Sequence, residues 1–264
     1  MSTSLLEKNP IAAVGHVIML FFAAMGRVAI FTYHILIEGF RPPYYPRQIG
    51  RMIIEIGYYS LPVVGLTTLF TGAALALQSY SGFKSYGAES AIPIIVALAI
   101  TRELGPVMAG LMVAGRIGAA FAAEIGTMRV TEQIDALTTL STSPYKYLLF
   151  PRVLVATLML PVLVFVGDII GIFGGYQVCM KVLHFAPMPY INNTWNFLAW
   201  HDVLGGLKKA AVFGFIVALM GCYHGYNSKG GAQGVGAATT NGVVSASILI
   251  LLANYILTQF LFKA

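Results

Sequence analysis

Residues 91–123 read AIPIIVALAITRELGPVMAGLMVAGRIGAAFAA, and their only charged side chains are Arg102, Glu103 and Arg116. A helix that spans a membrane needs about 20 mostly apolar residues, and this run exceeds that length. An ionisable side chain inside a membrane costs roughly 2.5–3.5 kcal/mol on insertion scales, so it marks a functional or packing-critical site by default. The run therefore predicts a transmembrane helix in which Arg102 and Glu103 have a specific task.

The rest of the chain has the same character. Of its 264 residues, 58% are hydrophobic and only 10% are charged, with a mean hydropathy of +0.78, whereas a soluble domain has roughly 25% charged residues. Four more segments are long and apolar enough to cross a bilayer, at residues 53–79, 147–180, 203–225 and 240–262. These features predict an all-α integral membrane protein with a bundle of five transmembrane helices over about 53–262.

The N-terminal segment, about residues 10–40, is ambiguous. It is apolar enough to insert at its start but is interrupted by His16, Arg27 and His34. Basic residues also flank it on both sides, with Lys8 before it and Arg41, Arg47 and Arg51 after it. Crossing the membrane would place basic residues on both faces, against the positive-inside tendency. We therefore predict a helix that lies along the cytoplasmic interface.

The remaining charges predict an orientation. Arg116, Arg129, Lys146, Arg152 and Lys229 fall in cytoplasmic positions if the N-terminus is cytoplasmic, whereas only Lys84 and Lys181 fall clearly outside. Lys208 and Lys209, at the outer start of the fourth span, count against this arrangement. The balance predicts a cytoplasmic N-terminus, five spans and an external C-terminus.

The polar connector between the second and third spans covers residues 124–137. Val130, Ile134 and Leu137 follow at i, i+4 and i+7, so they form one apolar edge of a helix. The other faces carry Glu124, Arg129, Glu132, Gln133 and Asp135. An interfacial helix is usually rich in Lys and Arg, but this segment holds three acids and one base. It therefore predicts a cytoplasmic amphipathic helix that docks a protein partner.

Arg102 and Glu103 are adjacent, so on a helix they point about 100° apart and need different partners or a wet cavity. A structural pair satisfied by neighbouring helices is the alternative. Small residues recur every four positions as Gly110, Ala114, Gly118 and Ala122, and again as Gly167, Gly171 and Gly175. Such ladders favour close helix packing in lipid, although they could also line a ligand groove.

Charge and motif content exclude several function classes. The net charge is +6, but the basic residues form no continuous stripe, which argues against nucleic acid and fits an anionic leaflet. Cys179 and Cys222 lack metal-ligand spacing. Hydrolase, metalloprotease and P-loop motifs are absent. We expect no catalytic residues, no metal site and no ATP hydrolysis by this chain.

Several motifs together resemble the MlaE permease family of bacterial ABC lipid transporters. They are LALQ (75–78), YGAE (86–89), RELGP (102–106), AGRIGAA (114–120), AEIGTMRVTEQIDAL (123–137) and PR (151–152), with further similarity at 234–240 and 254–255. The resemblance covers nearly the whole chain. Tyr86 stands where Phe is frequent in the family, and Met108 where Leu is common.

The resemblance implies a single permease domain over residues 1–264 of a homodimer in the bacterial inner membrane, with an N-terminal interfacial helix and five transmembrane helices. Its implied partners are a cytoplasmic ABC ATPase dimer that holds ATP and Mg²⁺, a STAS-domain accessory protein and a periplasmic MCE-domain hexamer. The implied cargo is phospholipid moving between the inner and outer membranes to maintain outer-membrane lipid asymmetry.

The resemblance also implies roles for particular residues. The 124–137 segment is similar to the coupling helix that fits a groove on the ATPase. The positions near the outward-facing lipid cavity are Leu75, Gln78, Tyr86, Arg102, Glu103 and Leu104. Two other function classes stay open from the residues alone. One is a secondary transporter or channel that uses Arg102 and Glu103 as an ion relay, and the other is a non-transporting scaffold for periplasmic subunits.

Overall fold

The computed structural model describes residues 10–39, 41–42 and 45–262, and within them every regular element is helical. The helices are α1 (Pro10–Gly39), α2 (Pro46–Ile56), α3 (Leu61–Phe83), α4 (Ile92–Ala99), α5 (Gly105–Val113), α6 (Ala119–Val130), α7 (Gln133–Thr139), α8 (Phe150–Lys181), α9 (Pro187–Phe197), α10 (Trp200–Tyr226) and α11 (Gly231–Leu261). Short 3₁₀ turns are η2 (Tyr58–Ser60), η3 (Lys84–Tyr86) and η4 (Glu89–Ala91). Three π-helical turns are η5 (Ile100–Leu104), η6 (Ala114–Gly118) and η7 (Tyr145–Leu149).

The predicted membrane segments correspond to long apolar helical stretches. Five of these stretches match the five predicted spans, over Pro46–Tyr86, Glu89–Val130, Tyr145–Lys181, Trp200–Tyr226 and Gly231–Leu261. The all-α membrane protein and its multi-pass character are therefore confirmed. A sixth stretch, Ile18–Gly39 in α1, is also long and apolar enough to cross a membrane.

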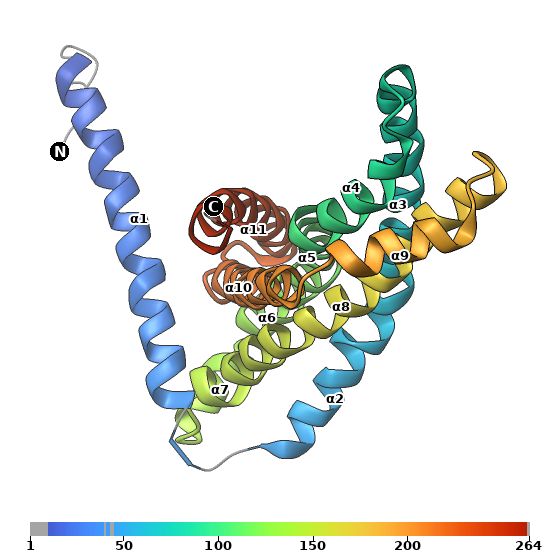
Figure 1. Cartoon of the computed structure of the whole chain (residues 1–264). Helices are drawn as coiled ribbons and strands as arrows, with labels where there is room; N and C mark the ends of the chain where they lie inside the picture. The colour runs from blue at the N-terminus through green and yellow to red at the C-terminus, as the bar shows by residue number, and fades with distance from the viewer. Residues whose placement is uncertain (1–9, 40, 43–44, 263–264) are drawn as a thin grey trace.

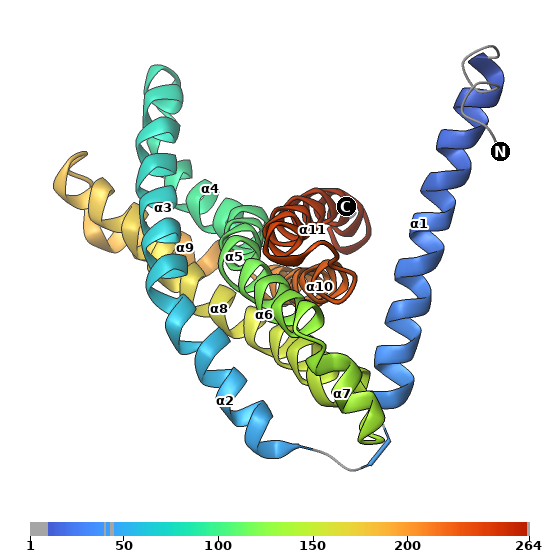
Figure 2. The same cartoon turned by 180° about the vertical axis from the view of Figure 1, so that it is seen from behind.

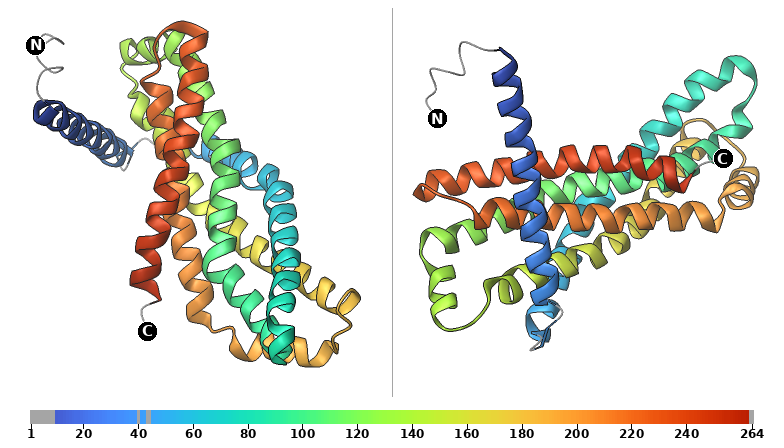
Figure 3. Two further views of the ribbon diagram at one scale, coloured as in Figure 1. Left: turned by 90° about the horizontal axis from the view of Figure 1, so that it is seen from above. Right: turned by 90° about the vertical axis from the view of Figure 1, so that its left-hand side faces the viewer.

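Helix α1 leaves the bundle and runs crosswise to α10 and α11 (Figures 1 and 3). It is held at one end, where Phe31 and Ile35 are buried. The Phe31 ring packs edge-on against Tyr145 and Tyr223, with ring centroids 5.7 and 5.4 Å apart. Between residues 18 and 30, most apolar side chains are exposed. The position of α1 along a membrane interface stays a prediction.

The other helices form an elongated bundle around α10, which packs against α5, α6, α8 and α11 (Figures 2 and 3). One end of the bundle holds α7, the start of α8 and the end of α10, and we call it the α7 end. The opposite end holds α9, the start of α10 and the hairpin between α3 and α4, and we call it the α9 end. The sequence predicts that the α7 end is cytoplasmic and that the α9 end is external.

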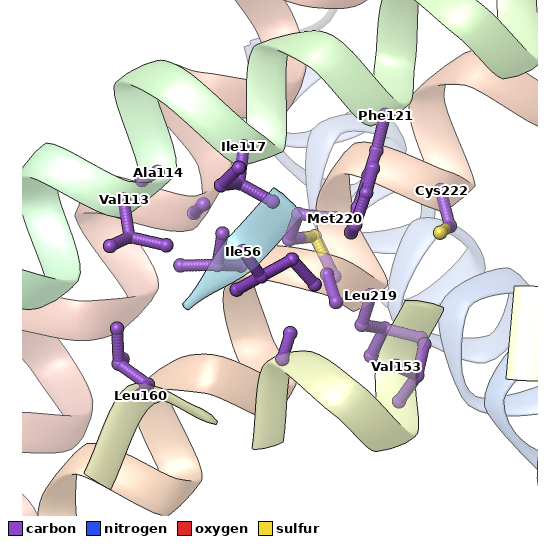
Figure 4. Packing of buried hydrophobic residues seen from close by; sticks show 14 of the residues in the cluster. Ile56, Val113, Ala114, Ile117, Phe121, Val153, Leu160, Leu219, Met220 and Cys222 are labelled. Carbon is purple, nitrogen blue, oxygen red and sulfur yellow. The ribbon is translucent and has the colours of Figure 1, made fainter. Parts of the chain in front are cut away.

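Apolar side chains from most of the helices form the main core, with the largest share from α8 and α10. Figure 4 shows Ile56 from α2 between Ile117 of the second span, Leu160 of α8 and Met220 of α10. A smaller cluster near the α9 end gathers Ala76, Ile92, Ile100, Cys179 and Tyr190. The smaller cluster contains Ile92 and Ile100 of the second span, and the main core contains its residues from Ala109 to Ile125. The second span is therefore packed along most of its length.

Glycines allow the closest helix contacts. A Cβ at Gly167 would lie 3.2 Å from Val64 and Thr68 of α3, and one at Gly171 would lie 3.1 Å from the Thr68 carbonyl oxygen. A Cβ at Gly206 of α10 would overlap the carbonyl oxygen of Thr101 in η5. The close-packing interpretation is therefore confirmed for the ladder in α8, which faces α3.

Candidate functional site

Glu103 lies at the centre of a polar network that joins η5, α10 and α11. Its Oε1 accepts from Lys209 Nζ at 2.7 Å and from Thr258 Oγ1 at 2.9 Å. Its Oε2 accepts from Asn254 Nδ2 at 2.8 Å. Lys209 is fully buried, whereas the Glu103 side chain is 35% exposed. The carboxylate therefore binds two neighbouring helices and still reaches the edge of the protein.

Pro106 explains why Lys209 is needed at this position. In a regular α-helix, the amide N–H of residue 106 would donate to the carbonyl of Arg102, but proline has no N–H. Lys209 Nζ donates to the Arg102 carbonyl oxygen at 2.8 Å, so a side chain from α10 replaces the missing donor. A π-helical turn often marks a functional site, and here it holds both charged residues of the pair.

Arg102 points to a different partner. Its Nη2 and Nε lie 2.7 and 2.8 Å from Oδ1 of Asp202, near the start of α10. Asp202 is buried, and its Oδ2 also accepts from the Ala199 amide at 3.1 Å, which caps the helix. The Arg102 side chain remains 39% exposed. The expectation that Arg102 and Glu103 find separate partners is confirmed.

The network is balanced in charge because two cations meet two carboxylates. The ring of Phe262 lies 5.0 Å from the Arg102 guanidinium carbon and 5.1 Å from Lys209 Nζ. Aromatic faces attract cations at this distance. Arg102 and Glu103 therefore hold neighbouring helices together and are also partly exposed. A structural role and a binding role for the pair are thus compatible.

The other predicted cavity residues do not join this network. Leu104 is half-buried beside the pair, and Leu75 packs against the smaller core cluster. Gln78 and Tyr86 are exposed, and Tyr86 reaches 83%. Tyr86 belongs to η3 at the tip of the hairpin, which projects away from α10 and α11 (Figures 1 and 3). The single chain thus brings together Arg102, Glu103 and Leu104 only.

Sequence reasoning missed four members of the network: Lys209, Asp202, Asn254 and Thr258. In the sequence, Lys209 stands out only as a charge that counts against the predicted topology. Polar residues inside apolar segments were the available signal, because such residues usually pair within a bundle. The Asn254-Tyr255 match had marked this part of α11 without giving it a role.

Arg116, the third charge of the second span, has a structural task. Its Nη1 donates to Ser60 Oγ at 2.8 Å and to the Glu55 carbonyl oxygen at 3.2 Å. These acceptors lie on either side of the bend between α2 and η2. The guanidinium therefore holds the bend that separates α2 from the membrane-spanning helix α3.

The connector at 124–137 differs from the prediction of one continuous helix. Helix α6 ends at Val130, and α7 begins at Gln133. Glu132 has a φ of 60°, in the left-handed region, which ends the helical path. Ile134 is buried but Val130 is 39% exposed, so the two do not share the predicted apolar edge. The single-helix prediction is wrong, and a shorter helix α7 follows a sharp corner.

The predicted coupling residues surround this corner. Arg129 Nη1 lies 2.6 Å from Oδ1 of Asp135, which clips the end of α6 to α7. Glu124 pairs with the buried Arg152 of α8 at 2.7 Å. Glu132, Gln133 and Asp135 are exposed. A shallow pocket of about 600 Å³ lies beside them, lined by Glu124, Gln133 and Met128 among others. The corner is therefore a fixed polar surface.

The described part of the chain contains no group of three or more His, Cys, Asp or Glu side chains that could hold a metal ion. Cys179 and Cys222 are both buried and free. The polar network and the corner thus remain the two candidate sites, one toward each end of the bundle.

Comparison with known proteins identifies the family. A family model described as Permease MlaE matches residues 49–260. A probable ABC transporter permease protein of Rickettsia felis is 53% identical over 251 residues, which cover 95% of this chain and 97% of that protein. The intermembrane phospholipid transport system permease protein MlaE of Haemophilus influenzae is 34% identical over 260 residues, or 97% of this chain and 98% of that one. The chain is thus a member of the MlaE permease family.

Proposed function

We propose that this chain is the membrane permease subunit of an ATP-driven transporter that moves phospholipid between the inner and outer membranes. The name of the Haemophilus relative refers to intermembrane phospholipid transport, and the Rickettsia relative is named as an ABC transporter permease. The geometry of the Arg102 network also favours a cargo that carries a phosphate group.

The observation that carries the proposal is the half-exposed guanidinium of Arg102. Asp202 accepts from Nε and Nη2, and a guanidinium has five N–H donors in a planar fork. Asp202 therefore fixes the orientation of the fork, and the partly exposed guanidinium keeps further N–H donors for a ligand. A fixed guanidinium suits bidentate binding of phosphate better than a flexible ammonium does. The lipid phosphate would bind here, with Glu103 and Leu104 forming the adjacent wall.

The cavity would be completed by a second copy of the chain. Helix α11 carries Asn254 and Thr258 toward Glu103, but its outer face exposes Ile248, Leu251, Leu252, Tyr255 and Phe260. In a homodimer, this apolar face would meet the partner subunit or the lipid chains. The same cavity would also be lined by Leu75, Gln78 and Tyr86. One chain alone does not enclose it, so the second copy would supply the missing side.

The direct test is ATP-dependent lipid transfer in liposomes that contain the permease and its ATPase partner. With fluorescent phospholipid, Arg102→Ala is expected to lower transfer by about tenfold to a hundredfold, because a charge-assisted hydrogen bond is worth roughly 1.5–3 kcal/mol. Arg27→Ala, in α1, is the matched control and should transfer normally. Transport by the permease alone would favour a secondary transporter. If the complex assembled fully but neither the unmodified protein nor either variant transferred lipid, a non-transporting scaffold would be favoured.

The α6–α7 corner would receive force from the ATPase dimer. Its exposed acids are Glu132, just before α7, and Asp135 within it. Ile134 anchors α7 in the core, and the pair between Arg129 and Asp135 joins it to α6. A rigid segment of this kind would transmit motion to the second span, which carries Arg102 and Glu103 in its half nearer the α9 end. Helix α1 would lie in the cytoplasmic interface, because it runs crosswise to the spans (Figure 3). The STAS-domain protein and the MCE-domain hexamer complete the proposed assembly through the family resemblance.

Reversing the corner charges tests this coupling. Glu132→Lys combined with Asp135→Lys should reduce co-purification of the ATPase about tenfold or more, since like charges at an interface cost several kcal/mol. The control is Glu89→Lys, which reverses a carboxylate in η4 at the opposite end. Normal ATPase retention and normal lipid transfer in the double variant would exclude the corner as the docking surface.

A further inference from the structure

Asp168, in the middle of α8, is a buried carboxyl that the network does not use. It is only 4% exposed. Neither of its oxygens has a hydrogen-bond partner among the described residues. The backbone makes room for it, since a Cβ at Gly105 would overlap Asp168 Oδ1. A buried polar group without a partner costs free energy that an apolar residue would avoid, so this position requires an explanation.

The carboxyl lines a pocket of about 510 Å³ at the α9 end. One wall comes from α8 through Phe165, Ile169 and Ile172. The other side is lined by Trp195 and by Leu198, Ala199 and Trp200. Both tryptophans are largely exposed, at 83% and 72%. Trp200 is the first residue of α10 and Val203 lies one turn later. The carboxyl therefore lies close to the level at which α10 begins.

An apolar track continues from this pocket along α8. Leu158, Val162, Phe165 and Ile169 are all exposed and follow at spacings of four, three and four residues. That spacing places them on one face of the helix. A hydrocarbon chain that lies along this face would have its polar end at Asp168 and its tail directed toward the α7 end.

The charge pattern indicates which polar group fits. The two cations of the Arg102 network are already paired, Arg102 with Asp202 and Lys209 with Glu103. The ion pairs of the described residues do not include Asp168. A cation from outside the chain would neutralise the carboxylate, and tryptophan faces attract ammonium groups, including quaternary ones. Thr101 lines the same pocket, but Arg102 and Glu103 do not.

We propose that this pocket is a second lipid site, which binds the ammonium headgroup of a zwitterionic phospholipid at Asp168 beneath Trp195 and Trp200. The acyl chain lies along the α8 track. The site borders the Arg102 network at Thr101 and Ala199 but contains none of its charged side chains, and it binds a different chemical group of the lipid. It needs neither ATP nor a transport cycle, so its test is independent of the proposed function.

The test is lipid retention by the full chain, purified with its partners from membranes and exchanged into an equimolar mixture of three dioleoyl phospholipids. The headgroups are ethanolamine, choline and glycerol, and native mass spectrometry counts the bound lipids. We expect the two ammonium lipids to be retained about fivefold over phosphatidylglycerol. Asp168→Asn, which keeps the shape, should abolish this preference. Glu89→Gln removes a carboxylate at the same end of the bundle but outside the pocket, so it should leave the lipid preference unchanged.

The two ammonium lipids distinguish the source of the preference. Retention of phosphatidylethanolamine alone would support N–H donation to the carboxylate, and equal retention of phosphatidylcholine would support charge and aromatic contact. An unchanged preference in Asp168→Asn would overturn the site and would favour a neutral carboxyl bonded within its own helix. Ile169→Trp provides a second variant, because it fills the pocket from its exposed rim and leaves the carboxyl in place. It should also abolish the preference, and an unchanged preference there would likewise overturn the proposal.

Discussion

Lys209→Met is expected to destabilise the protein by about 3 kcal/mol, the lower end of the range for a broken buried ion pair, because Glu103 is left without its cation but is 35% exposed. Lys209 is fully buried and donates to Glu103 Oε1, Thr258 Oγ1 and the Arg102 carbonyl oxygen. Its loss also leaves that carbonyl without the donor that Pro106 cannot supply. Both effects fall on η5, so the π-helical turn should lose its fixed geometry.

Thermal unfolding of the purified protein in detergent measures this effect. Lys208→Met is the matched control, since Lys208 is the exposed neighbour on the same helix and its substitution should shift the midpoint little. Lys209→Met combined with Glu103→Gln should recover most of the loss, because it replaces the pair by neutral groups of similar volume. Equal midpoints for the Lys208 and Lys209 variants would show that the buried pair contributes nothing to stability.

Gly206→Ala is expected to have the second largest effect, at about 1–3 kcal/mol or more. The new methyl group would overlap the Thr101 carbonyl oxygen. That acceptor is backbone and cannot rotate away, so α10 and η5 must separate. Their separation would stretch the bonds from Arg102 to Asp202 and from Glu103 to Lys209. We therefore expect loss of lipid transfer together with a lower unfolding midpoint.

Gly236→Ala, in α11, is the control for this substitution. A Cβ there meets nothing within 4 Å, and alanine is a better helix former than glycine by about 1 kcal/mol. The two glycine substitutions should therefore shift the unfolding midpoint in opposite directions. A midpoint for Gly206→Ala at or above that of the unmodified protein would mean that the helices do not approach as closely as described.

The membrane fold could be predicted because it depends on local quantities. Length and hydropathy are properties of each segment alone, and residues 91–123 already exceed the thickness of a bilayer as a helix. The glycine ladder in α8 was equally readable, since a spacing of four residues places small side chains on one face. The corner after Val130 was not readable in this way, because Glu132 adopts a left-handed conformation that is uncommon for its residue type.

The partners of the charged pair could not be predicted for a different reason. Arg102 and Asp202 are separated by 100 residues, and Glu103 and Asn254 by 151. Such pairings depend on how whole helices pack, which no local pattern contains. Lys209 appeared to be a topology signal because its burial against Glu103 becomes visible only in the folded bundle. Asp168 also lies in an otherwise strongly apolar segment, so the criterion that singles out Arg102 and Glu103 applies to it as well.

The polar network also constrains the order in which the protein is made. Glu103 is synthesised 106 residues before Lys209, which corresponds to roughly 5–20 s of translation at ordinary rates. During that interval the second span enters the bilayer with both charges unpaired, at a cost of roughly 2.5–3.5 kcal/mol for each ionised side chain. Insertion of α10 supplies Asp202 and Lys209 together, and α11 then adds Asn254 and Thr258. Biogenesis of the second span is therefore complete only when a helix made later arrives beside it.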